Sequence, residues 1–427
     1  MSTPVFVEVT NTLHANWTTG LQRLTRELLS RLPRSEQSDV YFVPVIWCED
    51  HEGYRRLTDE ERVALVYPGE PAASALDRLP VWAARTARLA TSGRVGTRIK
   101  RAVKNRARRP STPASEELVI GELPRGSVFL DMEPSWHDPL PRSELLPRLQ
   151  RRGIPIVVVH PDVMPERHPD WFLPEVVRAY DEHLRAHLRH SALFMCISAQ
   201  SESDLRAFCA EQYPDHEIDT CTIKLGADFR PLRFQHDDKA LPPAVKRFVL
   251  SVSTLEPRKN YPLLLDAFDR LRSDYDDLGL VIVGKPGWST EAVVRRITSH
   301  PEYRRRLIWY RSADDTTLGR LYDGAHLTVT PSFYEGLGLP VMESLQRGSV
   351  VLSSSGGGLP EAGGDFAEYF DPHDLDELVR LIRRHLDDED YHRERLARVS
   401  QYVAPTWDGT TEEVLAAVRR VVHEQVR

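Results

Sequence analysis

The chain has 427 residues, of which 41% are hydrophobic and 28% are charged. These values are ordinary for a globular protein of two or three domains, so they exclude a wholly disordered chain or a fibre. The formal net charge of −7 argues against a general nucleic-acid binder, and the apolar runs are far shorter than the roughly 20 residues of a membrane-spanning helix. Residues 1–10 hold no basic segment followed by an apolar core, so we expect no secretory signal.

Strand-like and helix-like segments alternate along the chain. It begins with a predicted strand at Val5–Thr10 and an amphipathic helix at Leu21–Leu32, whose leucines recur at spacings of three and four. Further apolar runs predict strands at Tyr41–Trp47, Val128–Leu130, Ile154–Val159, Phe194–Ile197, Thr222–Leu225, Phe248–Val252, Leu278–Val283, Leu307–Tyr310, Leu327–Thr330 and Val350–Ser353. Runs of this kind are typical of parallel strands covered on both faces, so the sequence predicts an α/β protein.

A stretch rich in proline and charge, 229–246, predicts a domain boundary. We place one domain at 1–235 and a second at 246–403. Two such α/β layers predict a two-lobed protein whose ligands bind at the carboxyl ends of the strands. The last segment, Thr410–Val426, is helix-like, with Thr410 or Thr411 as the expected cap.

Two other features of the sequence bear on location and partners. The segment Arg94–Arg109 holds eight basic residues and no acid, which predicts either a solvated insertion or a patch for anionic lipid head groups or an anionic acceptor. The four cysteines form no CxxC pair and fit no zinc spacing, so we expect buried thiols in a reducing cytoplasm.

The segment that follows the strand at 327–330 carries the clearest chemical signal. Gly336 and Gly338 let the backbone approach a ligand closely, and the free N–H groups of the helix that begins near Leu339 favour an anion such as a phosphate. Glu335 and Glu343 lie eight residues apart, so their carboxylates can meet different parts of one extended ligand.

Three other segments point to the same kind of ligand. Arg258 and Lys259 follow a predicted strand and would neutralise a diphosphate. The turn in Val281–Trp288 is a plausible wall for a nucleobase, and the three glycines at 356–358 suit close approach to a ligand.

Taken together, these segments resemble the retaining glycosyltransferases of the GT-B fold, specifically glycosyltransferase family 4 (group 1). The resemblance is strong over 248–403, where EPRKN, EGLGLPVME and GGGLPE each sit where the family has its counterpart. The most similar branch is that of the bacterial mannosyltransferases that build surface polysaccharides. The resemblance implies two Rossmann-like domains with parallel sheets facing across a cleft, and a terminal helix in 404–427 that packs back on the N-terminal domain.

In the second half, the resemblance implies a donor site. Arg258, Lys259 and the helix start near Leu339 would stabilise the leaving diphosphate, with Gly336 and Gly338 at the same turn. Glu335 would hold sugar hydroxyls and stabilise the positive sugar ring, without acting as a nucleophile. Glu343 would accept hydrogen bonds from the ribose.

In the first half, the resemblance is looser. Gly20 and Arg23 are similar to the family's first glycine loop and its following arginine, which approach the leaving phosphate or the acceptor. His160 is similar to the family's cleft histidine, near the sugar and the acceptor. The family often has His-Asp there, whereas this chain has His160-Pro161-Asp162, which leaves the role of Asp162 open. Residues 47–122 match no familiar segment.

The resemblance implies transfer of a hexose, with retention, from a nucleoside diphosphate sugar to a hydroxyl of a glycan or lipid-linked acceptor in cell-surface polysaccharide or glycoconjugate biosynthesis. GDP-mannose is the expected donor, while UDP-hexoses, ADP-sugars and a dTDP-deoxysugar stay open. No metal or other cofactor is expected, because Arg258 and Lys259 replace a divalent ion, and Asp374–Asp376 is interpreted as a helix cap. The expected location is the cytoplasm, at the inner face of the membrane if Arg94–Arg109 binds it.

Two other functions fit the same fold. One is a nucleotide-sugar epimerase, or a phosphorylase, which would need a lysine for pyridoxal phosphate that nothing in the sequence indicates. The other is a catalytically inactive GT-B subunit that only binds a partner. The intact Arg258, Lys259, Glu335 and Glu343 argue against the inactive subunit.

Overall fold

The computed structural model describes residues 2–15, 20–35, 37–66, 119–228 and 245–425. Contacts along the chain divide it into two compact units, 1–127 and 128–427, and each is described by itself. The basic segment Arg94–Arg109 and almost all of the stretch 229–246 lie outside the described residues. The domain limits predicted above stay predictions.

The first unit combines a parallel pair of strands with an antiparallel edge. Its described elements are β1 (Thr3–Glu8), α1 (Thr10–His14), α2 (Gly20–Arg31), β2 (Val40–Cys48), η1 (Glu49–His51), β3 (Gly53–Arg56), α3 (Asp59–Val66) and β4 (Val119–Gly121). β1 pairs with β2 in parallel, whereas β3 pairs antiparallel with both β2 and β4. The sequence pattern missed β3 and β4 because Gly53–Arg56 holds two arginines and Val119–Gly121 only two apolar residues, so neither segment forms an apolar run.

The second unit begins with a parallel sheet in the order β5-β6-β7-β8. Its elements are β5 (Val128–Asp131), η3 (Ser135–His137), α6 (Arg142–Arg151), β6 (Ile156–His160), α7 (Met164–Arg167), η4 (Pro169–Trp171), α8 (Pro174–His190), β7 (Leu193–Cys196), α9 (Ala199–Gln212) and β8 (Thr220–Thr222). Apolar side chains of α8 and α9 share one core with β6 and β7. Cys196 and Cys209 are buried in this core, whereas Cys48 and Cys221 are only partly buried, and all four thiols are free.

A second parallel sheet follows in the order β11-β10-β9-β12-β13-β14. Its strands are β9 (Arg247–Val252), β10 (Leu278–Val283), β11 (Leu307–Tyr310), β12 (Leu327–Thr330), β13 (Val351–Ser354) and β14 (Glu368–Phe370). Its helices are η5 (Pro257–Lys259), α10 (Tyr261–Leu271), α11 (Glu291–Thr298), α12 (Asp315–Gly324), α13 (Leu339–Gln346), α14 (Leu359–Gly363), α15 (Leu375–Asp387) and α16 (Glu389–Val399). Asp374 caps α15 by accepting a hydrogen bond from the Glu377 N–H, as predicted.

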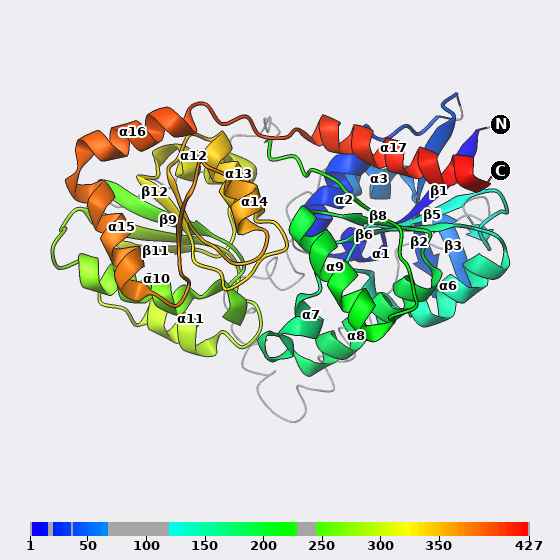
Figure 1. The fold of residues 1–427 in the computed structure, drawn as a ribbon, viewed down its shortest axis with the longest axis horizontal. Helices are drawn as coiled ribbons and strands as arrows, with labels where there is room; N and C mark the ends of the chain where they lie inside the picture. The colour runs from blue at the N-terminus through cyan, green and yellow to red at the C-terminus, as the bar shows by residue number, and fades with distance from the viewer. Residues whose placement is uncertain (1, 16–19, 36, 67–118, 229–244, 426–427) are drawn as a thin grey trace, which may run out of the picture. The chain divides into compact units, whose positions relative to one another are not determined.

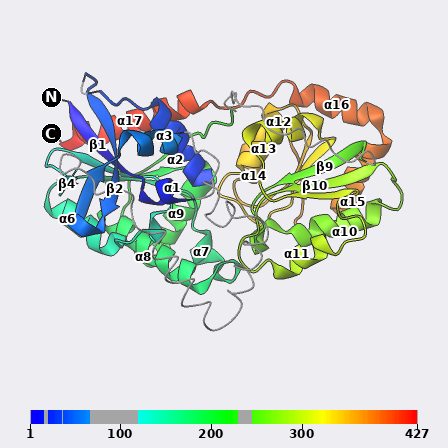
Figure 2. The same cartoon turned by 180° about the vertical axis from the view of Figure 1, so that it is seen from behind.

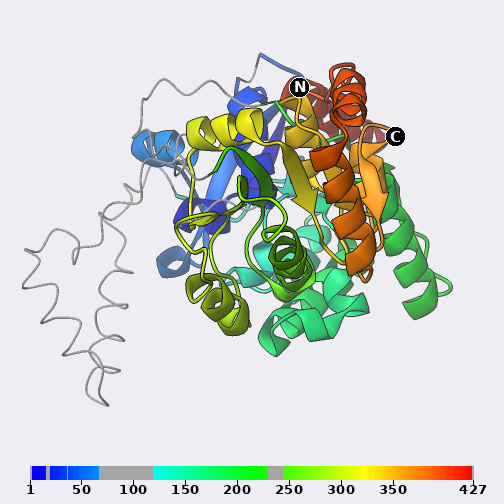
Figure 3. The ribbon, with the colours of Figure 1, turned by 90° about the vertical axis from the view of Figure 1, so that its left-hand side faces the viewer.

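Alternate residues of the central strands of this sheet face opposite cores, as the pleat requires. Val249, Leu280 and Ile282 pack with α10, α11 and α15, whereas Leu250 and Val281 pack with α12. Figures 1 and 2 show these helices on the two faces of the sheet, with α13 and α14 on the side of α12. Figure 3 shows α10 and α15 side by side.

The last helix, α17 (Trp407–Gln425), is fixed to residues on both sides of β8 in the chain. The Trp407 N–H donates to Asp228 Oδ1 at 2.7 Å, and Arg420 pairs with Asp219 at 3.0 Å. The prediction of a cap at Thr410 or Thr411 is wrong, because the helix begins three residues before Thr410. The Thr410 hydroxyl lies inside the helix and donates to the Lys224 carbonyl oxygen at 2.7 Å. Among the described residues, no helix combines the length and the apolarity that crossing a membrane requires.

Candidate active site

The turn between β12 and α13 is shaped by a glycine with a positive φ. Gly338 has φ 116° and directly precedes α13, with Pro340 in its first turn. A side chain rarely adopts this conformation, so glycine is needed where the chain turns into the helix. Leu339 is the partly buried first residue of α13, at the end where free N–H groups favour an anion.

Glu335, in this turn, joins the two predicted cationic residues in one ion-paired cluster. Its carboxylate lies 2.5 Å from Arg258 Nη1 and 2.5 Å from Lys259 Nζ, and it accepts a hydrogen bond from Ser332 Oγ at 2.6 Å. The side chains of Arg258, Lys259 and Glu335 are only 16%, 11% and 11% exposed. A second carboxylate, that of Glu256, accepts a hydrogen bond from Arg258 Nε at 3.2 Å.

The cluster keeps its charges despite its burial. Burial alone raises the pKa of Glu335, but Arg258 and Lys259 outweigh it and lower this pKa to about 2. For Arg258, burial lowers the pKa, whereas Glu335 and Glu256 more than reverse that effect and raise it. For Lys259, burial and the neighbouring Arg258 lower the pKa, although Glu335 opposes them. The result is a preorganised pair of cations, whose donors can bind phosphate oxygens as they bind the carboxylate.

The three glycines at 356–358 lie close against protein backbone, and the ligand approach predicted from the sequence stays a prediction. A Cβ on Gly356 would lie 2.0 Å from the Phe333 carbonyl oxygen, and one on Gly357 would lie 2.3 Å from that of Glu335. Gly357 forms a parallel bridge with Glu335, and the Gly358 N–H donates to the Glu335 carbonyl oxygen at 2.8 Å. This segment therefore holds the backbone that carries the Glu335 carboxylate.

Gly336 brings the same turn against the end of β6. A Cβ there would lie 2.5 Å from the Pro161 carbonyl oxygen, so only glycine fits. The Gly336 carbonyl oxygen accepts hydrogen bonds from Ser198 Oγ at 2.5 Å and Ser201 Oγ at 3.1 Å. Ser201 Oγ is also within 2.6 Å of the Pro161 carbonyl oxygen. The residues after β6, the start of α9 and the Glu335 turn thus meet.

His160, the last residue of β6, has a buried imidazole that is 3% exposed. Burial is the larger effect that lowers its pKa, and the nearby His187 adds to it. The pKa falls to about 3, so the ring is neutral at physiological pH. Its Nε2 atom is buried and has no hydrogen-bond partner among the residues that the structure describes. A buried nitrogen of this kind costs free energy until a partner such as a ligand hydroxyl meets it.

The remaining predicted site residues lie elsewhere. Glu343 is buried on α13, where it accepts a hydrogen bond from Tyr322 Oη at 3.0 Å. Gly20 and Arg23 lie on α2 in the first unit, which is described separately from the unit that holds Glu335. Their predicted roles stay predictions.

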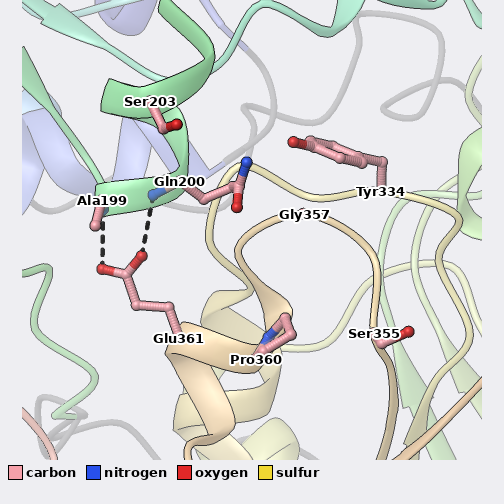
Figure 4. Close-up of a pocket in the computed structure, with 8 residues that line it drawn as sticks. All are labelled: Ala199, Gln200, Ser203, Tyr334, Ser355, Gly357, Pro360 and Glu361. Atoms are coloured by element: carbon pink, nitrogen blue, oxygen red, sulfur yellow. Dashed lines mark hydrogen bonds between the residues drawn. The ribbon is translucent and has the colours of Figure 1, made fainter.

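A pocket of about 480 Å³ opens beside the Glu335 turn. It is lined by Ala199, Gln200, Ser203, Tyr334, Ser355, Gly357, Pro360 and Glu361, which Figure 4 shows. On one side, the Glu361 carboxylate accepts hydrogen bonds from the Ala199 and Gln200 N–H groups at 3.0 and 3.2 Å. On the other side, Tyr334 Oη donates to the Asp204 carboxylate. These contacts join residues more than 100 positions apart, so no local sequence pattern could reveal them.

Within the described ranges, one group of side chains has the spacing of a metal site, namely Asp131, His183 and His187. Asp131 Oδ2 lies 2.5 Å from Arg142 Nε and 3.1 Å from His187 Nε2. Arg142 already supplies the positive charge that a metal ion would bring, so these residues fit a buried polar network better than a metal site.

Residues 233–403 match the family model of the glycosyl transferases group 1, and this segment includes Arg258, Lys259, Glu335 and Glu343. The chain therefore contains a group 1 glycosyltransferase domain, which confirms the resemblance to the group 1 glycosyltransferases.

Similar proteins include bacterial mannosyltransferases. Over 240 residues the chain is 28% identical to the serotype-specific mannosyltransferase WbdA of Escherichia coli, covering 54% of this chain and 29% of that protein. Over 270 residues it is 30% identical to the O-antigen chain mannosyltransferase B of Escherichia coli, covering 60% of this chain and 66% of that protein. The chain thus spans less than a third of WbdA and just under two thirds of the second relative.

Solved structures resemble this one in fold. Anabaena HepE in complex with UDP-glucose has a TM-score of 0.60 and 13% identity, covering 98% of this chain and 99% of that one. The sucrose-phosphate synthase of Thermosynechococcus elongatus has a TM-score of 0.60 and 16% identity, covering 99% of this chain and all of that one. At such identities the likeness concerns the fold alone, and it confirms the predicted α/β GT-B class.

Proposed function

We propose that this protein is a retaining glycosyltransferase of family 4, which transfers a hexose from a nucleoside diphosphate sugar to a hydroxyl acceptor. The observation that carries the proposal is the buried cluster in which Arg258 and Lys259 both contact the Glu335 carboxylate. The group 1 domain match over 233–403 supports it.

The reaction separates charge, and the cluster is suited to stabilise both parts. When the bond between the anomeric carbon and the diphosphate oxygen breaks, the diphosphate gains negative charge and the sugar ring becomes positive. Arg258 and Lys259 bind the leaving diphosphate, together with the N–H groups at the start of α13 near Leu339. Glu335 is then released toward the sugar, where it binds hydroxyls and stabilises the positive ring. The acceptor oxygen forms the new bond, and its proton leaves with the diphosphate.

His160 and Glu343 complete the proposed donor site. The buried Nε2 of His160, unpartnered among the described residues, is suited to bind a hydroxyl of the sugar or the acceptor. Glu343 binds the ribose hydroxyls, and Gly20 and Arg23 approach the leaving phosphate or the acceptor. No metal takes part, because the two cations carry the positive charge that the diphosphate needs.

We propose GDP-mannose as the donor and a glycan or lipid-linked glycan of a cell-surface polysaccharide as the acceptor. Two Escherichia coli relatives, a serotype-specific mannosyltransferase and an O-antigen chain mannosyltransferase, support this choice. UDP-linked donors are the alternative, because HepE was solved with UDP-glucose. The anomeric configuration of the product on a synthetic alkyl α-mannoside, determined by NMR, tests this proposal. An α-linked product from GDP-α-mannose supports it, and a β-linked product contradicts retention.

We further propose that the enzyme works in the cytoplasm, at the inner face of the membrane, through Arg94–Arg109. Removal of this segment should weaken binding to vesicles that contain anionic lipid, and added salt should weaken binding of the intact chain. The control is a vesicle of neutral lipid, to which both proteins should bind equally weakly. Equal binding to anionic vesicles before and after removal contradicts the membrane contact.

A further inference from the structure

A third carboxylate, that of Asp162, lies beside the Glu335 turn and interacts with the cation pair. Asp162 follows β6 by two residues, and its Oδ1 accepts a hydrogen bond from the Met164 N–H at 2.9 Å. Its Oδ2 lies 3.4 Å from the position that a Cβ on Gly336 would take, so it borders the Glu335 turn. Its side chain interacts electrostatically with Arg258, Lys259 and Glu335.

The other titratable groups near Asp162 come from neighbouring elements. Tyr180 on α8 donates its hydroxyl to the Asp162 carbonyl oxygen, and Tyr334 in the Glu335 turn interacts with the carboxylate. Glu166 on α7 interacts with Tyr180. His160, two residues earlier, stays neutral at physiological pH because burial lowers its pKa to about 3. Among the described groups that interact with the Asp162 carboxylate, the cations are Arg258 and Lys259, which offset its negative charge.

The protonation state of Asp162 sets the net charge that meets a diphosphate. The Asp162 and Glu335 carboxylates interact with Arg258 and Lys259, whereas Glu256 interacts with Arg258 and with a third cation, Lys285. With Asp162 ionised, three cations meet three carboxylates and the cluster is neutral, whereas with Asp162 protonated it carries one net positive charge. A diphosphate esterified at both ends carries two negative charges, so the second form attracts it more strongly than the first.

We propose that Asp162 links donor binding to proton uptake: the nucleoside diphosphate sugar binds preferentially to the form in which Asp162 is protonated. This inference rests on the proposed function, because it concerns the same donor site. Asp162 acts here as a positioning residue, which sets the charge of the cation pair and takes no part in bond breaking. The diphosphate of the sugar nucleotide pairs with the two cations. The proton then neutralises the Asp162 carboxylate, which no longer interacts with them.

The pKa of Asp162 suits this role. Burial is the largest effect and raises the pKa to about 6, although Arg258 opposes it. A bound diphosphate adds negative charge and draws Arg258 and Lys259 toward itself, so the pKa rises further in the complex. Between these two pKa values the donor affinity falls as the pH rises, by at most about tenfold per pH unit for one proton.

Titration calorimetry tests the proposal directly. GDP-mannose and UDP-glucose are the probes, because their esterified phosphates do not titrate between about pH 5.5 and pH 8. Measurement at about pH 7 in buffers of different ionisation enthalpy counts the protons taken up per donor bound. We expect uptake of up to one proton for the natural chain and almost none for Asp162→Asn. At about pH 8, Asp162→Asn should bind the donor more tightly than the natural chain does.

Glu166→Gln is the matched control. Burial, followed by Asp181, raises the pKa of Glu166 to about 6, but the Glu166 carboxylate interacts with Asp181 and Arg185. This variant should therefore keep the proton uptake of the natural chain. Equal proton uptake in Asp162→Asn and the natural chain overturns the inference alone. Weaker binding of Asp162→Asn at every pH also overturns it, because that result indicates a merely structural role. Failure of the natural chain to bind either sugar nucleotide at any pH overturns both the inference and the proposed donor site.

Discussion

Replacement of Glu335 by glutamine should separate donor binding from turnover. The variant keeps the shape and the Ser332 contact of the side chain but removes the charge that holds Arg258 and Lys259 at 2.5 Å. A diphosphate then no longer competes with the Glu335 carboxylate for the two cations. We therefore expect nucleoside diphosphate affinity to be equal or higher, while turnover falls by roughly 10²–10³ because the positive sugar ring loses its carboxylate.

The same substitution should destabilise the folded chain. A pKa lowered from 4.5 to about 2 corresponds to about 3 kcal/mol of preferential stabilisation of the charged form of Glu335. This value agrees with the loss of about 3–5 kcal/mol seen when one partner of a buried ion pair is removed. The midpoint of thermal unfolding should fall by several degrees, and added diphosphate should restore part of that loss.

The assays are calorimetric titration with the nucleoside diphosphate and release of the nucleoside diphosphate from the sugar donor. Glu256→Gln is the matched control, because Glu256 also contacts Arg258, at 3.2 Å, but not Lys259. The control should change turnover far less than Glu335→Gln does. Turnover of Glu335→Gln within a few-fold of the natural chain would refute the role given to this carboxylate.

Three further predictions follow from the same contacts. Arg258→Met combined with Lys259→Met should weaken nucleoside diphosphate binding by at least about 100-fold, because both charge-assisted donors are lost. Calorimetry measures the affinity, and an unchanged affinity would place the diphosphate elsewhere. Gly336→Ala should lower the free energy of unfolding, measured in urea, by about 1–3 kcal/mol, because its Cβ would lie 2.5 Å from the Pro161 carbonyl oxygen. The control is Gly324→Ala, whose Cβ would meet only the Phe248 ring, at 3.6 Å. Equal losses in the two variants would contradict the close approach. The stability that the ionised Glu335 provides is complete above its usual pKa of 4.5 and is lost as the pH falls toward about 2. Acid should therefore lower the free energy of unfolding, measured in urea, more for the natural chain than for Glu335→Gln. The same dependence of this free energy on pH in both proteins would contradict the pairing.

The sequence indicated three residues of the candidate site because their signals are local. Arg258 and Lys259 follow one strand and Glu335 follows another, and parallel strands bring such ends to one edge of a sheet. The three side chains therefore meet as their positions suggested. The glycines at 356–358 pack against the backbone of the Glu335 turn, a contact that a pattern of glycines alone does not reveal.

The parts that sequence reasoning missed depend on contacts across long stretches of chain. The Glu361 carboxylate caps α9 from 162 residues away, and the sequence around Glu361 contains no pattern that predicts this contact. Asp162 was left without a role because proline separates it from His160, whereas its place beside Arg258 and Lys259 depends on how β6 and the Glu335 turn meet. The start of α17 was misplaced because Thr410 is a good capping residue whose hydroxyl is used in a tertiary contact.

The central claim is that the Arg258–Lys259–Glu335 cluster binds a nucleoside diphosphate. Thermal unfolding with GDP, UDP, ADP and dTDP, each at about 100 times an expected micromolar dissociation constant, tests it most directly. Binding at that ratio adds about 2.7 kcal/mol, which raises the midpoint by a few degrees. We predict a selective rise with one nucleotide, GDP, that disappears when Arg258 and Lys259 are both replaced by methionine. No rise with any of the four, from folded protein, would contradict the claim.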